Sequence, residues 1–220
     1  MQVSRVLRNS LWLAALCAYA QDSAAPTINP VDVPRMLPRS GANDYQAHVR
    51  VGPIAIGAEF MRHAVPTPQA EFTTEDYVVV EVGFFGPPGV KERLNTQDFS
   101  IRVNGKKAVQ SQPFGMVLAN LKDPSWQPPE PPKPKAGGLS TGSEGGGNPG
   151  DPPPAPPKMP LALVHAMQLR VERASMPEGD RVLPEAGLLF FPYRGVSDKI
   201  KSVELFYSGP SGKATLTLQP

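Results

Sequence analysis

Histidine and methionine side chains raise the possibility of a metal site. Imidazole nitrogens and thioether sulfurs both bind copper, so a periplasmic copper-type carrier would use His48, His63 and Met61. No two histidines of the chain have the i, i+2 or i, i+4 spacing that brings ligands together on one strand or helix. We therefore predict no metal and no other cofactor, and keep the copper-type carrier as an alternative function.

Hydrolysis needs an activated nucleophile or a suitable pair of carboxylates, and the sequence has no G-x-S-x-G motif. Glu81 is unusual because it lies inside the apolar run 77–85, and a buried carboxylate there needs a cation such as Arg102 or Lys106. No set of residues supplies nucleophile, base and stabiliser together, so we predict that the protein is not an enzyme, with a hydrolase as the less favoured alternative. The carboxylates that a hydrolase could pair are Glu59, Glu75, Asp76, Glu81 and Asp98.

The N-terminus is typical of a secretory signal peptide over residues 1–20. Arg5 and Arg8 precede the apolar run 11–18, and Ala18-Tyr19-Ala20 has the small-x-small pattern of a cleavage site. We predict cleavage near Ala20 and a periplasmic or secreted, extracytoplasmic location, with an uncleaved anchor as the alternative. Cleavage would remove Cys17, the one cysteine of the chain, so we expect no disulfide.

Net charge argues against some classes of partner. The formal charge is +2, and the two arginines of the signal are its only charges, so the mature chain carries 2 − 2 = 0. A neutral chain has no overall electrostatic attraction for nucleic acid or for an anionic membrane. The sequence predicts no transmembrane segment after the signal is removed.

The pattern of apolar residues predicts a mainly β protein. Residues 21–43 are rich in proline and without period, so they are interpreted as an extended segment. Alternation of apolar and polar residues from Tyr45 onward predicts strands. The run Tyr77–Phe85 is β-branched and aromatic almost throughout, which predicts a central strand covered on both faces. Other expected strands are 45–51, 54–60, 99–103, a run after the Asn104-Gly105 turn, 114–118, 187–193, 200–208 and 213–218.

Proline and glycine dominate residues 123–160, which hold 13 of the 28 prolines. We interpret this segment as a long disordered insertion. A helix is predicted over 161–176, behind Pro160, with an apolar stripe of Val164, Met167, Val171 and Ala174. The strands after the insertion are too few for a core of their own, so we predict one β-sandwich domain over 44–220, with a separate second domain as the alternative.

One arrangement resembles a known family. The strand YVVVEVGFF is followed by Asp98-Phe99 in LNTQDFSIRVNGKK, and later by Gly187–Phe190 in AGLLFFPY and by IKSVELFYSG. These runs resemble the telokin-like, immunoglobulin-like domains of bacterial secreted proteins, over residues 45–118 and 185–218. The resemblance implies an immunoglobulin-like β-sandwich and an extracytoplasmic setting, and it implies no reaction. Together with the helix predicted over 161–176, the fold we expect is an immunoglobulin-like β-sandwich with one α-helix. The insertion and the helix depart from the family pattern.

The sequence favours a non-catalytic binding or accessory module that acts through protein–protein contacts, its partner being another envelope protein. Polyproline segments are pre-extended docking ligands, although a tolerated surface insertion has the same composition. The helix either packs on the sandwich or contacts a partner. The aromatic residues Phe84, Phe85, Phe190, Phe191 and Tyr193 either fill the core or line a pocket. The candidate partner-binding residues are Trp126, Pro128, Pro129, Pro131, Pro132, Pro153, Pro154, Arg170 and Arg173.

Overall fold

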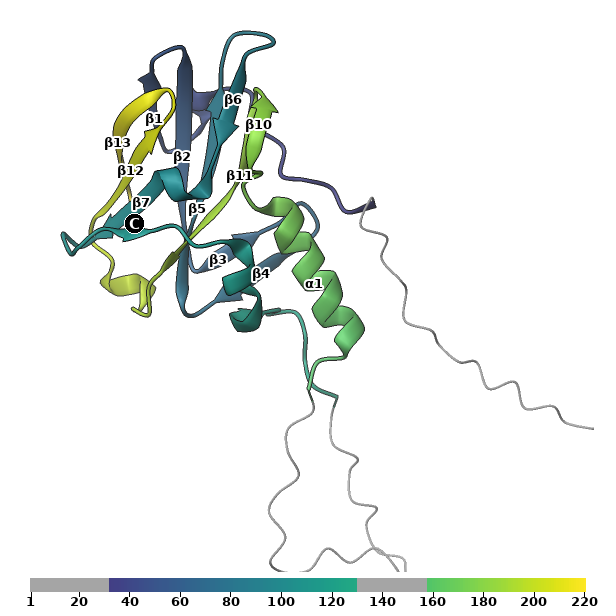
Figure 1. Ribbon diagram of the computed structural model, residues 1–220. Helices are drawn as coiled ribbons and strands as arrows, with labels where there is room; N and C mark the ends of the chain where they lie inside the picture. Colours follow the sequence, from purple (N-terminus) through teal and green to yellow (C-terminus); the bar gives the residue numbers. More distant parts are fainter. Residues whose placement is uncertain (1–31, 130–157) are drawn as a thin grey trace, which may run out of the picture.

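The computed structural model of the 220-residue chain describes residues 32–129 and 158–220. These residues form antiparallel sheets and one α-helix, which confirms the mainly β class (Figure 1). The predicted signal peptide 1–20, residues 21–31 of the extended segment 21–43 and most of the insertion lie outside the described residues.

Two four-stranded sheets share one hydrophobic core. The first sheet has the order β1-β2-β5-β11, formed by Ala47–Val51, Ile54–Arg62, Tyr77–Phe85 and Glu185–Pro192. The second has the order β13-β12-β7-β8, formed by Gly212–Leu218, Val203–Gly209, Phe99–Val103 and Val109–Gln110. Side chains from both sheets, including Ile56, Val80, Ile101 and Leu205, are completely buried in this core.

Smaller elements cover the outer side of the first sheet and extend its end. The single α-helix of the described residues, α1, is Leu161–Ala174. The three-stranded sheet has the order β3-β4-β9, formed by Ala64–Pro66, Glu71–Thr74 and Leu121–Lys122. A two-stranded ribbon pairs β6, Lys91–Leu94, with β10, Gly179–Val182. The 3₁₀ turns are η2 Ala42–Asp44, η3 Thr96–Asp98, η4 Phe114–Met116, η5 Leu118–Asn120 and η6 Ser197–Lys199.

Strand β5 is covered on both faces, as its sequence predicts. Val78, Val80 and Val82 point into the core between the two sheets, because alternate residues of a strand share a face. Tyr77 and Val79 point the other way, into a second hydrophobic core under α1 and the β3-β4-β9 sheet. The apolar run Tyr77–Phe85 therefore contributes side chains to both hydrophobic cores.

Strands from the two sides of the proline-rich segment pair directly. β11 pairs with β5 over Glu185–Pro192, β12 pairs with β7, and β10 pairs with β6. Each pairing joins a residue C-terminal to α1 with one that precedes residue 104. Both parts of the chain thus contribute to the same sheets.

Helix α1 packs through the predicted stripe. Met167, Val171 and Ala174 are buried in the second core, whereas Val164 is only half-buried. The helix ends at Ala174, two residues before the predicted end, because Ser175 is extended (φ −67°, ψ 152°). The N–H of Met176 then donates to the carbonyl oxygen of Leu188 at 3.0 Å, which turns the chain onto the edge of β11. No helix in the described residues is long and apolar enough to cross a bilayer.

Two local predictions have different outcomes. The turn at Asn104-Gly105 is confirmed, with φ values of 52° and 68°, and pairing of the returning strand starts only at Val109. The strand predicted over 114–118 is wrong, because this segment forms the turns η4 and η5. Pro113 precedes η4 and lacks the N–H that a paired strand would use, and Val117 is the one fully buried side chain of 114–118.

Glu81 has a different cation from the two that the sequence suggests. It lies directly opposite Glu59 of β2, and Arg39 bridges the two carboxylates with N–O distances of 3.0 Å to Glu81 and 2.5 Å to Glu59. Arg102 instead pairs with Glu204 on the second sheet. The guanidinium of Arg39 also lies 4.4 Å from the ring centroid of Tyr45, so it ties the N-terminal segment onto the outer face of the first sheet.

We predict that Arg39→Met lowers the free energy of unfolding by about 1–2 kcal/mol, because two facing carboxylates, one of them 7% exposed, lose their shared cation. Urea denaturation followed by circular dichroism measures the loss. Adding Glu81→Gln to Arg39→Met should recover part of it, because one of the two opposed charges is removed.

The matched control is Arg102→Met. Its ion pair with Glu204 also joins neighbouring strands, but both side chains are more exposed, at 41% and 36%. We expect a loss below about 1 kcal/mol. Equal losses for the two arginine variants would contradict a special role for Arg39.

Candidate binding site

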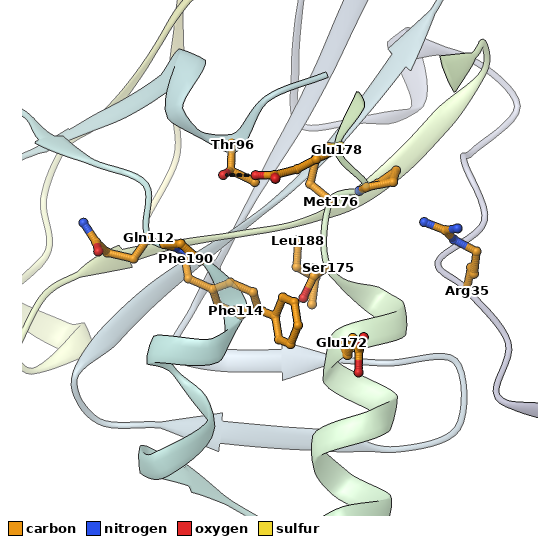
Figure 2. A pocket seen from close by; sticks show the side chains of 12 residues that line it. Arg35, Thr96, Gln112, Phe114, Glu172, Ser175, Met176, Glu178, Leu188 and Phe190 are labelled. Atoms are coloured by element: carbon orange, nitrogen blue, oxygen red, sulfur yellow. Dashed lines mark hydrogen bonds between the residues drawn. The ribbon is translucent and has the colours of Figure 1, made fainter. Parts of the chain in front are cut away.

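A cavity of about 270 Å³ lies where the C-terminal end of α1 meets the edge of β11. Its floor is apolar and consists of Leu188 and Phe190 from β11, Met176, and Phe114 from η4. Figure 2 shows the ring of Phe114 between η4 and α1, with Gln112 on one side of the cavity and Glu172 and Arg35 on the other.

The walls are held to the strand edge by backbone hydrogen bonds. The N–H of Gln112 donates to the carbonyl oxygen of Phe190 at 2.7 Å, and that of Met176 donates to Leu188. Leu188 and Phe190 are two residues apart, so their side chains share the outer face of β11. The cavity is therefore the gap between two segments that each touch the edge of β11 at one residue.

Gly187 allows this close approach. A Cβ atom at this position would lie 2.4 Å from Cα of Met176 and 2.8 Å from the carbonyl carbon of Ser175. Both are backbone atoms, which cannot rotate away as a side chain would. Only glycine lets the chain leaving α1 lie this close to β11.

The rim of the cavity is charged. Glu172 belongs to the last turn of α1, Glu178 accepts a 2.8 Å hydrogen bond from the hydroxyl of Thr96, and Arg35 comes from the N-terminal segment. All three charged residues are exposed. Two carboxylates and the partial negative charge of the helix C-terminus outweigh one guanidinium, so the rim favours a cationic group.

None of the predicted partner-binding residues that the structure describes lines this cavity. Trp126 is half-buried, and Pro128 and Pro129 are exposed at the end of a described range. On α1, Nε of Arg170 donates to Oε1 of Gln69 at 3.0 Å, and Arg173 is half-buried one residue after Glu172. Pro131, Pro132, Pro153 and Pro154 lie outside the described residues.

The metal-ligand candidates are not brought together. His48 is exposed on β1 opposite Gly57, and His63 lies six residues beyond Gly57, about 20 Å along the strand direction. Both ring nitrogens of His63 contact backbone carbonyl oxygens, Nδ1 at 2.6 Å from Tyr77 and Nε2 at 2.8 Å from Gly195. Met61 is half-buried against the second core. No group of three or more His, Cys, Asp or Glu side chains in the described residues could hold a metal ion.

The carboxylates considered for hydrolysis are dispersed. Besides the Glu59 and Glu81 pair, Lys122 lies 2.6 Å from Glu75 and Arg194 lies 2.9 Å from Asp76. The pKa of Glu75 is lowered by its hydrogen bond to Lys122.

Sequence reasoning missed Glu92. This carboxylate is buried and accepts a 2.9 Å hydrogen bond from the hydroxyl of Ser211. The pKa of Asp98 is raised by burial and then by the negative charge of Glu92. Burial also raises the pKa of the Tyr207 hydroxyl, and Glu92 again adds to the effect. The segment Lys91–Leu94 is mostly charged, so its sequence gives no signal that the side chain of Glu92 is buried.

Tyr45 shows how closely the outer face of the first sheet is packed. Its side chain lies over Gly57 and Gly83, where an added Cβ atom would come 2.5 Å from ring carbon Cδ2 and 2.5 Å from the hydroxyl oxygen, respectively. Burial raises the pKa of the Tyr45 hydroxyl to about 12, and the charge of Glu81 adds to this. Among the proposed aromatic pocket residues, only Phe190 lines the cavity, while Phe84 and Phe191 fill the core between the sheets.

Comparison of the chain with models of protein families, with curated proteins and with solved structures gave no match.

We predict that Gly187→Ala lowers the free energy of unfolding by about 1–3 kcal/mol, because the new methyl group pushes Ser175 and Met176 away from β11. The hydrogen bond from Met176 to Leu188 should break, so the amide of Met176 should exchange its hydrogen faster in NMR. Gly115→Ala is the control, because its added Cβ would meet nothing within 4 Å. Normal protection at Met176 in Gly187→Ala would contradict the close packing.

Proposed function

We propose that the protein is a non-catalytic binding module of the cell envelope that acts through protein–protein contacts. The observation that carries this proposal is the cavity beside α1, with an apolar floor of Leu188, Phe190 and Phe114 and a charged rim. Well-packed pockets that exclude water are where the dominant anchor residues of protein–protein interfaces bind.

The size of the cavity limits what enters it. A volume of about 270 Å³ is below the roughly 300–1,000 Å³ of pockets that hold small-molecule ligands. One bulky apolar side chain of a partner fits this volume better than a cofactor does. Buried apolar anchors of this kind supply most of the affinity in protein interfaces.

The charges around the mouth select the neighbouring residue of the partner. Glu172 and Glu178 both lie at the rim, close to the negative end of the α1 dipole. A lysine or arginine beside the apolar anchor would lie against these carboxylates. We therefore propose that the recognised segment combines a bulky apolar residue with a basic residue.

The remaining expectations belong to the same proposal. An extracytoplasmic location is supported by the charged and apolar pattern of residues 1–20 and by the single cysteine within it. An immunoglobulin-like description of the fold is supported by the two antiparallel sheets that share one core. The proline-rich segments 127–135 and 152–158, most of which lie outside the described residues, are a second candidate contact surface.

Selection from a library of displayed peptides tests the proposal. We expect the enriched peptides to share a bulky apolar residue next to lysine or arginine. In Glu172→Arg, the affinity for these peptides should fall by about tenfold, because attraction at the rim becomes repulsion. Phe114→Ala should weaken binding of the same peptides, because the floor loses its aromatic ring.

The control is Glu71→Arg, which makes the same charge change at an exposed residue of β4 outside the cavity. It should leave peptide affinity within about twofold. Peptides that bind Glu172→Arg and the unmodified chain equally well would contradict the proposed site.

A further inference from the structure

The side chain of Asn104 joins two distant loops at one end of the second sheet. Its Nδ2 donates to the carbonyl oxygen of Lys199 at 2.8 Å, and its Oδ1 accepts from the N–H groups of Lys201 and Ser202 at 2.6 and 3.2 Å. The N–H of Asn104 also donates to the carbonyl oxygen of Ser202 at 2.9 Å. The turn after β7 and the loop before β12 are therefore fixed beside each other (Figure 1).

These two loops carry four lysines. Lys106 and Lys107 follow the turn, and Lys199 and Lys201 lie in the loop, and all four side chains are exposed. Within the described residues, none of the four forms an ion pair. Asp198 is the one acidic residue of segments 104–107 and 197–202, so this basic edge has a local charge of 4 − 1 = +3.

An exposed apolar side chain lies at the base of the same loop. Val196 immediately precedes η6 and is 59% exposed. Cations around an apolar side chain suit the interface of a bilayer, where lysines contact headgroup phosphates and the apolar group enters the boundary with the acyl chains. A soluble polyanion would use the lysines and leave Val196 in water.

We propose that the basic edge, formed by Lys106, Lys107, Lys199 and Lys201, binds the phosphate-bearing surface of an anionic membrane. The zero net charge expected for the mature chain gives no sign of this basic edge. Its lysines come from segments almost a hundred residues apart, so no local run of the sequence shows them together. In Figure 1 the turn after β7 and helix α1 lie on opposite sides of the molecule, so a chain bound through this edge keeps the cavity free for a partner. The inference does not depend on the cavity.

Co-sedimentation of the full chain with vesicles of phosphatidylcholine, with and without phosphatidylglycerol, tests the proposal. We expect binding to the anionic vesicles that weakens as salt rises. Each lysine near such a surface contributes about fivefold to the partition coefficient, so Lys106→Gln/Lys107→Gln should weaken binding by about 25-fold, and Lys199→Gln/Lys201→Gln by a similar factor. Residues 1–20, with Arg5, Arg8 and the apolar run 11–18, would also contribute to vesicle binding. They are identical in every variant, so the difference between the edge variants and the unmodified chain isolates the four lysines.

Two further variants separate this edge from general positive charge. Lys91→Gln/Lys213→Gln removes two exposed lysines on β6 and β13, away from the basic edge, and should have a much smaller effect on binding. Asn104→Gly retains all four lysines and tolerates the positive φ, but loses the hydrogen bonds that hold the loops together, so binding should weaken.

Three results would overturn the proposal. The first is equal binding to both kinds of vesicle by the unmodified chain. The second is an equal loss in Lys91→Gln/Lys213→Gln and in the edge variants. The third is tight binding to soluble polyphosphate without binding to anionic vesicles, which would assign the edge to a polyanion instead.

Discussion

The burial of β5 on both faces is the constraint on which the rest of the structure depends. A strand with Val78, Val80 and Val82 on one side and Tyr77 and Val79 on the other has to be covered twice. The second sheet covers the first side. Helix α1 and the β3-β4-β9 sheet cover part of the second side, and the remainder lies under the N-terminal segment. Each covering layer follows from apolar surface that one strand cannot leave in water.

The two halves of the outer face are covered by different kinds of interaction. The contact between α1 and the first sheet is apolar, and the cavity beside Leu188 and Phe190 lies at its edge. Under the N-terminal segment it is polar, with Arg39 held between two carboxylates and Tyr45 lying over two glycines. A polar contact of this kind needs an accurate fit, because an unpaired buried carboxylate is costly.

Sequence patterns predicted the elements better than the site. The alternation in 77–85 and the helical stripe of Met167 and Val171 were sufficient for the central strand and for α1. The strand predicted over 114–118 was wrong, because apolar residues after a proline are also compatible with 3₁₀ turns. The prediction for Glu81 was right in expecting a cation, but the partner came from the N-terminal segment, which has no periodic pattern to place it.

By itself, the sequence determined the long strands of the two four-stranded sheets and helix α1, because these depend on residues a few positions apart. The short strands β3, β4, β6, β9 and β10 were not predicted, because they have too few residues for a clear period. Tertiary structure alone decided which strands are neighbours and in what register. The pairing of β2 with β5 places Glu81 opposite Glu59. The tertiary structure also brings Gln112 and Met176 to the edge of β11, and it holds two pairs of lysines beside each other around Asn104. Such contacts arise between residues far apart in the chain, and their positions depend on how the strands pair around the two hydrophobic cores that share β5, which no local sequence pattern specifies.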